Sequence, residues 1–482
     1  MGSFATKLSR LPGMPSAPGP VSEAPLPTTN EREASLARLR EKMASIIARD
    51  RVPARESVEW GARARETSST SSIEHAFVEE QLPHGPLYVS RKPTPLGHRV
   101  GHVQVCAAHR AEPALLALLA LDPSLAQIDL RRALYLDTET TGLAGGTGTV
   151  PFLLGLGYFE PASDSLVVEQ VLLRKYAHEP AMVEHLRARL EAASAIITFN
   201  GKAFDMSLLR ARATMNRLSP LPERPHLDLL HVARRIHKHR LASCSLVKLE
   251  DHILGRARVG DVAGADIAAI YHHYVRTRDV AALEVVVEHN ALDVISMVAL
   301  VGLYGEPLSF TAEQAAAEAT LSPSDVAMAS VVLRRAGDFD RAHAVASASI
   351  ERGAGARGYR VRGDIEKARG DKARALSDYE AAASELATLP TRGAARSALE
   401  ETVDLYALHL ELAKLYEHHA RAYDKALEIV ARGTLEVREK SAARAQRLVR
   451  KREKTLARAE ETPRATAKQL LAEPRGRLKK RV

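Results

Sequence analysis

Two acids, Asp137 and Glu139, lie near the end of the segment "LYLDTET" and are separated by one threonine. The residues ahead of them are apolar without alternation, which predicts a strand buried on both faces. Residues two apart on a strand point to the same side, so both carboxylates should project together. Neighbouring carboxylates repel each other unless a proton or a cation lies between them, and we therefore expect a divalent metal ion here.

Two further acidic motifs support the same idea. The segment "AIITFNGKAFD" is predicted to be a strand that ends in an Asn-Gly turn, followed by a helix whose first turn carries Asp205. The segment "VVVEHNALDVISMVALV" is predicted to be a helix with His289 and Asp293 on one face, four residues apart. Asp205 could instead be a charge that stabilises a helix N-terminus, and Asp293 a solvated helix acid. In this order and with these flanking elements, the acids together favour a metal site.

The motifs "LDTETTGL", "FNGKAFD" and "EHNALDV" resemble the three exonuclease motifs of the DEDD (DnaQ-type) superfamily. Three segments, "HLDLLHVARRIHKHRLASCSLVKLEDHILG", "RVGDVAGADIAAIYHHYVRT" and "VVVEHNALDVISMVALV", are similar to its YprB-type branch. The resemblance covers roughly residues 84–303. It implies an α/β ribonuclease-H-like mixed sheet with flanking helices, followed by an all-α helical-repeat domain. It also implies a metal-dependent nuclease on DNA or RNA, specifically a 3′ to 5′ exonuclease.

The same resemblance assigns roles to individual residues. Two Mg²⁺ or Mn²⁺ ions would be held by four acids, since hard divalent ions prefer carboxylate oxygens: Asp137, Glu139, Asp205 and Asp293. Two such ions about 4 Å apart can activate a water on one side of a phosphodiester and stabilise the leaving oxygen on the other. The resemblance further implies substrate contacts by Thr138, Asn200 and Lys202.

The general base is expected at His289, one helical turn before Asp293. Better-characterised members carry a tyrosine four residues before the last acid or a histidine five before it, whereas this chain has His289 and Glu288 at those positions. His289 could instead be a packing histidine of the helix. Asp228 in "HLDLL" either supports the metal ligands from behind or starts a helix.

Other functions remain open at this point. A non-catalytic nucleic-acid-binding or assembly protein could keep the fold and act through its helical repeats and basic tail. The presence of all four acids favours the enzyme. A recombinase-type ribonuclease-H-like enzyme is disfavoured by the Asp-Thr-Glu pair and by the late His-Asn-x-x-Asp helix.

The chain that must position these residues divides into five predicted zones. Residues 1–30 are rich in Pro, Ser and Gly and predict a disordered tail. Residues 31–83 form a helix and a linker, and 84–303 the ribonuclease-H-like exonuclease domain. Its predicted strands include "RALYLDT", "PFLLGLGYF", "SLVVEQVLL" and "SAIITF". Residues 312–437 are expected to be tetratricopeptide-like helical repeats, and 438–482 a basic C-terminal tail.

The repeats are predicted from a similarity within the chain. "AGDFDRA", beginning at Ala336, recurs as "RGDKARA", beginning at Arg369, a shift of 33 residues. This is close to the tetratricopeptide period, and Ala342 and Ala375 occupy positions where paired helices approach closely. A plain helical bundle with chance similarity is the alternative. Helical repeats usually bind partners, so a protein partner is expected here.

The net charge of +9 is concentrated at the C-terminal end. Residues 438–482 hold 16 Lys and Arg against 5 Asp and Glu, a net charge of +11, which leaves −2 for the rest of the chain. The tail could contact nucleic acid or be a solvated charged helix end. A second basic concentration, residues 231–260, holds seven Lys and Arg and four His against two acids. It lies between two of the acidic motifs.

Cysteine usage and hydropathy indicate the cellular compartment that suits the chain. Cys106 and Cys244 are far apart and belong to no CxxC pair, so neither a disulfide framework nor a zinc ribbon is predicted. A reducing cytoplasm fits this usage. The apolar run "ALLALLAL" is far shorter than the roughly 20 residues of a membrane span, so we expect a buried helix there and no membrane partner.

Overall fold

The computed structural model describes residues 77–142, 148–278, 281–308, 321–388 and 395–471. The predicted disordered tail at 1–30 and most of the predicted helix and linker lie outside the described residues. The last eleven residues of the basic C-terminal segment also lie outside them.

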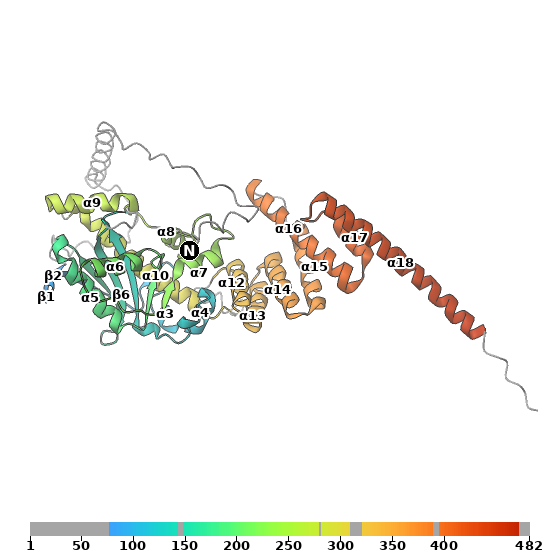
Figure 1. Ribbon diagram of the computed structural model, residues 1–482, viewed down its shortest axis with the longest axis horizontal. Helices are drawn as coiled ribbons and strands as arrows, with labels where there is room; N and C mark the ends of the chain where they lie inside the picture. The colour runs from blue at the N-terminus through green and yellow to red at the C-terminus, as the bar shows by residue number, and fades with distance from the viewer. Residues whose placement is uncertain (1–76, 143–147, 279–280, 309–320, 389–394, 472–482) are drawn as a thin grey trace, which may run out of the picture. The chain divides into compact units, whose positions relative to one another are not determined.

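A seven-stranded mixed sheet forms the centre of the fold (Figure 1). Its strand order is β1-β2-β7-β6-β5-β8-β9. The strands are β1 (Val78–Leu82), β2 (Gly85–Pro95), β5 (Ala133–Thr140), β6 (Pro151–Glu160), β7 (Ser165–Leu172), β8 (Ala195–Thr198) and β9 (His226–Asp228). Strands β3 (Arg99–Val100) and β4 (Val103–Gln104) make a separate small hairpin. The predicted α/β mixed sheet is therefore confirmed.

Strand pairing explains the mixture of directions. β8 is parallel to β5 and to β9, while β1, β2, β7, β6 and β5 pair antiparallel in turn. The four strands predicted from apolar runs correspond to β5, β6, β7 and β8. The sheet begins at Val78, inside the segment predicted to be helix and linker, because β1 pairs along its whole length with β2.

Alternate residues of β5 serve two hydrophobic cores on the two faces of the sheet. Ala133 and Tyr135 belong to one core, and Leu134 and Leu136 to the other. All four are buried, which accounts for the apolar run without alternation. By the same alternation, Asp137 lies on the face of Tyr135, two residues further along the strand.

Helices cover both faces of the sheet (Figure 1). They are α3 (Ala107–Arg110), α4 (Pro113–Ala120), α5 (Glu179–Ala192), α6 (Asp205–Met215), α7 (Leu229–His237), α8 (Leu246–Leu249), α9 (Gly264–Thr277) and α10 (Ala281–Gly305). Short 3₁₀ turns are η3 (Pro123–Leu125), η4 (Leu130–Arg132) and η5 (Tyr176–His178), and η6 (Glu250–Leu254) is a π-helical turn. Apolar residues of α5 and α6 join the core of Leu134, whereas those of α4 and α7 join the core of Tyr135.

The long helix α10 packs directly on β6. Gly155 and Gly157 permit this contact, because a Cβ atom there would lie 2.3 Å from Asn290 Oδ1 and 2.6 Å from Val294 Cγ1 respectively. Residues Leu283–Gly305 have the length and apolar composition of a membrane span, yet most of the most apolar stretch is buried inside the protein. A long, mostly apolar helix that is buried in this way is typical of a core helix.

The part of the chain after residue 320 is helical, as predicted. Its helices are α12 (Pro323–Arg335), α13 (Phe339–Glu351), α14 (Gly355–Arg369), α15 (Lys372–Thr388), α16 (Ala395–Leu415), α17 (Tyr423–Arg432) and α18 (Arg438–Leu471), with a π-helical turn η7 (Tyr416–Ala420). In Figure 1, α12 to α15 lie beside one another in chain order, beginning next to α4 and α7.

The two similar segments of the sequence have the same local structure. Each joins two antiparallel helices, with Gly337 and Gly370 in the left-handed region at φ of +92° and +91°. The aspartate that follows each glycine accepts a hydrogen bond at 3.0 Å from the backbone NH three residues later. Ala342 and Ala375 are fully buried. Both copies thus turn and start their second helix alike, while membership of the tetratricopeptide family stays a prediction.

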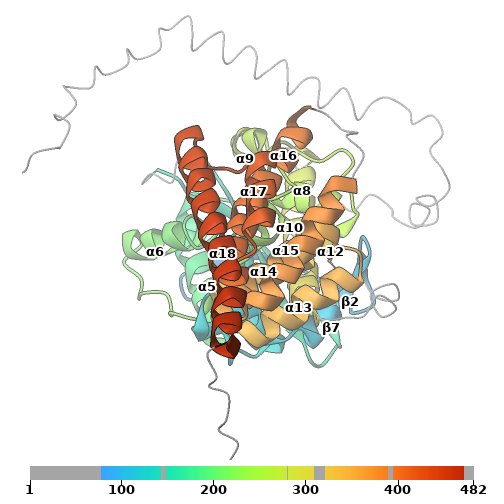
Figure 2. The same cartoon turned by 90° about the vertical axis from the view of Figure 1, so that its right-hand side faces the viewer.

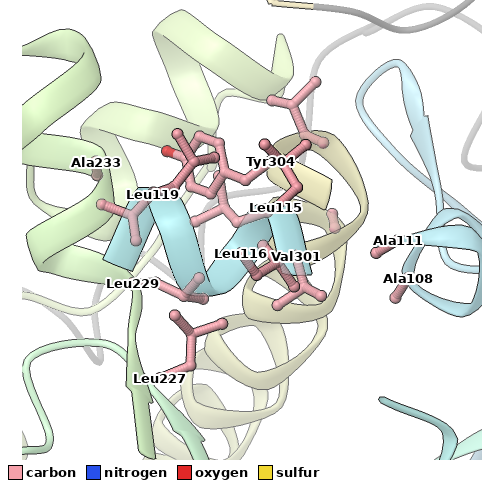
Figure 3. Close-up of a cluster of buried hydrophobic side chains, with 14 of the residues drawn as sticks. Ala108, Ala111, Leu115, Leu116, Leu119, Leu227, Leu229, Ala233, Val301 and Tyr304 are labelled. Atoms are coloured by element: carbon pink, nitrogen blue, oxygen red, sulfur yellow. The ribbon is translucent and has the colours of Figure 1, made fainter. Parts of the chain in front are cut away.

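The sheet and the first of these helices share one core. The hydrophobic cluster around Tyr135 continues through α4, α7 and α10 into α12, α13 and α14 without a break. Figure 3 shows Leu116 and Leu119 of α4 between α7 and α10, facing Ala233 and Val301. The described residues of the chain consequently belong to one unit.

A buried ion cluster joins α12 to α7. Asp325, 1% exposed, accepts hydrogen bonds from Arg240 Nη2 at 2.6 Å and from Ser322 Oγ at 2.7 Å. Nδ1 of His237 lies 3.0 Å from Asp325, and Nε2 of the same ring lies 3.0 Å from the hydroxyl of Tyr304 on α10. Burial would raise the pKa of Asp325, but His237 and Arg240 lower it far below its usual range. The carboxylate is therefore ionised and tightly held.

The basic segment after residue 437 begins as the helix α18, which lies beside α17 (Figure 2). Glu417, 2% exposed, accepts hydrogen bonds from Arg444, Arg447 and Lys451 of this helix at 2.7–2.9 Å. Burial would raise the pKa of Glu417, but Arg447 and Lys451 lower it to about 2. Three basic side chains of residues 438–482 thus pair with one acid inside the protein.

Candidate active site

Three elements bring the predicted acids together. Asp137 and Glu139 lie near the end of β5, Asp205 is the first residue of α6, and Asp293 lies in the middle of α10. α10 packs against β5 and β6, on the face toward which Asp137 projects. Nε2 of His289 lies 4.0 Å from Glu139 Oε1 and 3.6 Å from Asp293 Oδ2. The residues of all three sequence motifs therefore form one cluster.

Asp137 is held by an amide. Asn290 Nδ2 donates a hydrogen bond to Asp137 Oδ2 at 2.8 Å, and Asn290 Oδ1 accepts one at 2.9 Å from Gln170 on β7. Asn290 is fully buried, and Gln170 also donates to the carbonyl of Val287. Burial and the charges of Asp293, Glu139 and Asp205 raise the pKa of Asp137 well above its ordinary value.

Glu139 titrates near neutrality for a similar reason. Burial raises its pKa to about 7, and although His289 opposes this shift, the charges of Asp293 and Asp205 add to it. A carboxyl group with a pKa raised in this way releases its proton readily when positive charge is placed beside it.

Asp205 is anchored from the opposite side of β5. The hydroxyl of Thr138 donates a hydrogen bond to Asp205 Oδ1, and both residues are buried. Burial raises the pKa of Asp205 to about 6, against the lowering effect of Thr138 and of backbone NH groups. In this arrangement Thr138 positions a carboxylate, and its predicted contact with substrate stays a prediction.

Asp293 forms an ion pair with Arg258, which lies in the loop between η6 and α9. The Arg258 side chain is 2% exposed and also pairs with Glu250, a fully buried residue that accepts from Ser296 of α10. Burial raises the pKa of Asp293, and Arg258 and His289 oppose this rise. Arg258 therefore supplies positive charge to the cluster from within the chain.

His289 has a carboxylate on each side. Its Nδ1 lies 2.7 Å from Asp261 Oδ1, and because a carboxylate can only accept, Nδ1 carries the hydrogen. Nε2 faces Glu139 and Asp293. Burial would lower the pKa of His289, but Asp293, Asp261 and Glu139 together raise it above its ordinary value. A side chain oriented in this way can exchange a proton at Nε2.

The loop after β8 is fixed by Asp228. Its carboxylate accepts hydrogen bonds from the backbone NH groups of Asn200 at 2.9 Å and of Lys202 at 3.1 Å. It also accepts at 3.1 Å from the NH of Leu230, where it caps α7. Asp228 thus starts a helix, as one of the two interpretations has it, while its support of the metal ligands stays a prediction. Asn200, at φ of +67°, and Lys202 are exposed beside the carboxylate cluster, and their contact with substrate stays a prediction.

The donor set suits a hard divalent cation, although it is not arranged around one. Among the described residues, no three His, Cys, Asp or Glu side chains are grouped closely enough to hold one metal ion. Four carboxylate groups nevertheless lie near one another, and their mutual repulsion contributes to the raised pKa values of Asp137 and Glu139. Added positive charge relieves that repulsion, and oxygen donors are what Mg²⁺ and Mn²⁺ prefer. To bind such an ion, Asp293 would give up its ion pair with Arg258, and Asp137 its hydrogen bond from Asn290.

Sequence reasoning missed several members of the cluster. Asn290, Arg258, Asp261, Glu250 and Gln170 were not predicted, although Asn290 stands next to His289 in "EHNALD". Arg258 and Asp261 form "RVGD", which lies 28 to 35 residues before the acids and histidine that they contact. A loop residue at that separation gives no periodic signal, so its contact follows from the folded backbone alone.

Comparisons with known proteins agree with the fold. Residues 134–304 match a family model described as the RNase_H superfamily. Over this region the chain is similar to ribonuclease-H-like proteins, in agreement with the mixed sheet and its flanking helices. The Bacillus subtilis (strain 168) protein named "Uncharacterized protein YprB" is 39% identical to the chain over 168 residues, which are 34% of this chain. The chain spans 40% of the length of that relative, and the similarity is confined to this span.

Proposed function

We propose that the chain is a divalent-metal-dependent nuclease that hydrolyses phosphodiester bonds of DNA or RNA, and specifically a 3′ to 5′ exonuclease that uses two ions. One observation carries the proposal. Four carboxylates from β5, α6 and α10 converge beside a histidine whose other ring nitrogen is held by a fifth acid. The ribonuclease-H-like fold supports a nucleic-acid-directed hydrolase at the coarser level.

Different residues of the chain are proposed to bind the ions, to position the ligands and to accept a proton. Asp137, Glu139, Asp205 and Asp293 would hold the ions, with Asn290 and Thr138 keeping two of these carboxylates in place. When bound, divalent ions supply positive charge beside the phosphodiester and make a nearby water more acidic. His289 Nε2 accepts a proton from the attacking water, and Asp261 stabilises the imidazolium that results.

Substrate contacts are assigned to the exposed rim of the site. Lys202 is exposed and its Nζ lies 3.3 Å from Asp122 Oδ2, so it presents a cation next to the turn that starts α6. Asn200 in the left-handed region exposes its amide at the same turn. These groups are suited to phosphate and base contacts respectively. The helices after residue 320 are proposed to bind a protein partner.

An end-labelled assay tests the activity directly. Single-stranded and duplex DNA and RNA, each labelled at the 5′ end, are incubated with purified protein in Mg²⁺, Mn²⁺ or EDTA. We expect a ladder that shortens from the 3′ end with either metal and not with EDTA. Asp137→Asn should slow this cleavage roughly a hundredfold, which corresponds to about 3 kcal/mol of transition-state stabilisation. Cleavage by Asp137→Asn at the rate of the parent would contradict the proposed site.

A second candidate, a nucleic-acid-binding protein without catalysis, is supported by one observation. Arg258 already neutralises Asp293, so the cluster is partly balanced by the chain itself. The same assay separates the two candidates. Binding of the labelled strands without shortening in any metal, under conditions in which a control nuclease is active, favours the non-catalytic function.

A further inference from the structure

One face of α7 is entirely basic. His231, Arg234, Arg235 and Lys238 follow at spacings of three, four and seven residues, which places them on one side of the helix and its cap. Arg234 and Lys238 are exposed and Arg235 is half-buried. The opposite side packs into the core shared with α4 and α12. This accounts for the basic concentration between the acidic motifs, and we call the four residues the α7 basic face.

Neighbouring helices add further positive charge. Arg335, at the end of α12, lowers the pKa of Arg235 by repulsion in addition to the effect of burial. Arg357 of α14 acts in the same way on His239, which follows the α7 basic face, although burial again has the larger effect. Two cations from the helical region therefore lie close to the end of α7.

These cations lack carboxylate partners, unlike many arginines elsewhere in the protein. Within the described residues, Arg234, Arg235, Lys238, Arg335 and Arg357 form no ion pair, and Arg235 donates only to the carbonyl of Leu119. By contrast, exposed cations of α17 such as Arg432 do pair with acids. Adjacent unpaired cations raise the local potential, which an external polyanion lowers.

The α7 basic face leads toward the carboxylate cluster. α7 is capped by Asp228, which holds the backbone of Asn200 and Lys202. The nine residues of the helix span about 14 Å. A cavity of about 510 Å³ lies between α4 and α12, two helices that both pack against α7. Arg335 lines one side of the cavity, and Asp122, the partner of Lys202, lines the other.

We propose that the α7 basic face, with Arg335 and Arg357, is a track that binds the phosphates of a single nucleic-acid strand and directs the strand to the carboxylate cluster. This inference rests on the proposed function for the direction of the strand. The chemistry recognised is the phosphodiester backbone, which DNA and RNA share. Unpaired guanidinium and ammonium groups that follow one helix suit such a backbone and carry no base preference.

Binding is measured without cleavage. The full chain with Asp137→Asn is kept in EDTA, and its affinity for fluorescein-labelled single-stranded DNA and RNA of 12 nucleotides is measured by anisotropy between 50 and 200 mM salt. Arg234→Gln/Lys238→Gln removes two phosphate contacts, so the slope of log K against log salt should flatten by about 1.4. The ratio of affinities at the two salt concentrations should therefore fall about sevenfold. Arg335→Gln alone should flatten the slope by about 0.7.

A matched double variant controls for lost charge. Lys425→Gln/Arg432→Gln removes one lysine and one arginine from α17, where both are exposed and paired with acids, and should leave the slope unchanged. Equal slopes for the two double variants would overturn the track. So would an absence of strand binding by the parent at 50 mM salt, or competition by poly-glutamate as strong as that by unlabelled strand at equal charge.

The binding and cleavage experiments can contradict the track and the nuclease proposal independently of each other. If the wild-type chain cleaves no substrate but the salt slopes change as stated, the nuclease proposal fails and the track stands. If cleavage occurs and the slopes do not change, the nuclease stands and the strand reaches it by another surface. A difference between the DNA and RNA arms identifies the preferred backbone.

Discussion

At the scale of single residues, the two ring nitrogens of His289 have separate surroundings. Nδ1 is bound to Asp261, and Nε2 faces the carboxylate cluster. Asp261→Asn should lower kcat about tenfold, because the imidazolium formed in the reaction loses its counter-charge. It should also move the acid limb of the rate profile to lower pH, because Asp261 helps to raise the pKa of His289. Metal affinity should change little, since the four predicted ligands remain.

Kinetics of the two variants check this role. Asp251→Asn, on the exposed part of η6, serves as the control and should behave as the parent. An Asp261→Asn protein with the parent's kcat and pH profile would return His289 to a packing role.

The raised pKa values at the site also predict how stability depends on pH. Glu139 and Asp205 have pKa values of about 7 and about 6 in the folded protein, above their ordinary values of 4.5 and 3.8. The folded state therefore binds the protons of these two groups more tightly than the unfolded state does. Their contribution to the free energy of unfolding is complete below about pH 4 and is lost as pH rises through 6 and 7. For Glu139 alone the loss between pH 5 and pH 8 is about 2 to 3 kcal/mol.

Urea unfolding in EDTA measures that loss. Glu139→Gln should flatten the decline by about the same 2 to 3 kcal/mol, because the amide has no proton to release. Glu160→Gln, at the half-buried last position of β6 and outside the carboxylate cluster, is the control for the same substitution. A metal-free protein as stable at pH 8 as at pH 5, with no effect of Glu139→Gln, contradicts the assigned environment.

Among single residues, the acids of the site could be predicted from the sequence, whereas the side chains that bind those acids could not. Asp137, Glu139, Asp205 and Asp293 could be found because each ends a strand or lies on a periodic helix, and the structure brings them together. Arg258 could not be found, since its role depends on a loop that folds back onto α10.

At the scale of elements, the close contact between α10 and β6 sets the position of Asn290. Gly155→Ala would place a methyl group 2.3 Å from Asn290 Oδ1 and force the amide away from Asp137 and Gln170. We expect a loss of about 1 to 3 kcal/mol in the free energy of unfolding, as for overpacked cores. Cleavage should slow about tenfold because Asp137 loses its donor.

The comparison for this prediction is Gly264→Ala. Gly264 begins α9, and a Cβ there meets nothing within 4 Å, so its stability and cleavage rate should match those of the parent. Denaturant unfolding and the cleavage assay together test the pair. Equal values for the two alanine variants would show that β6 and α10 can separate without cost.

Strands were predictable for a physical reason. β5 to β8 are buried on both faces or nearly so, which makes their sequences continuous apolar runs. β1 was not predicted, because its residues alternate between exposed and half-buried and its sequence "VEEQL" carries two adjacent acids. Its place in the sheet depends on pairing with β2.

At the scale of the whole molecule, Asp325 joins the helical region to the sheet. Asp325→Ala leaves Arg240 and His237 without their carboxylate, and breaking a buried pair of this kind costs about 3 to 5 kcal/mol. Asp340→Ala removes an acid that is 91% exposed and paired with Arg369, and should cost less than about 1 kcal/mol. Thermal and urea unfolding of both variants test the difference. Similar losses for the two would show that the cluster contributes no more than a surface pair.

The helical nature of the chain after residue 320 and its two similar "GD" turns were predictable from the sequence, but the attachment of these helices to the sheet was not. The histidines and arginine of "HKHR" in the basic segment could equally have faced solvent. Their side chains instead turn toward Asp325, an acid more than 80 residues away in the sequence.

The continuous core has a practical consequence for whether the part that carries the carboxylate cluster can be separated from the rest of the chain. A chain cut after residue 308 would expose the apolar sides of α4 and α7 that Val326, Leu333 and Val345 now cover. It would also leave His237 of α7 and Tyr304 of α10 without the acid beside them. The carboxylate cluster is therefore not a portable module that can be moved between proteins on its own. A rearranged gene that keeps this site intact must keep at least α12 and α13 with it.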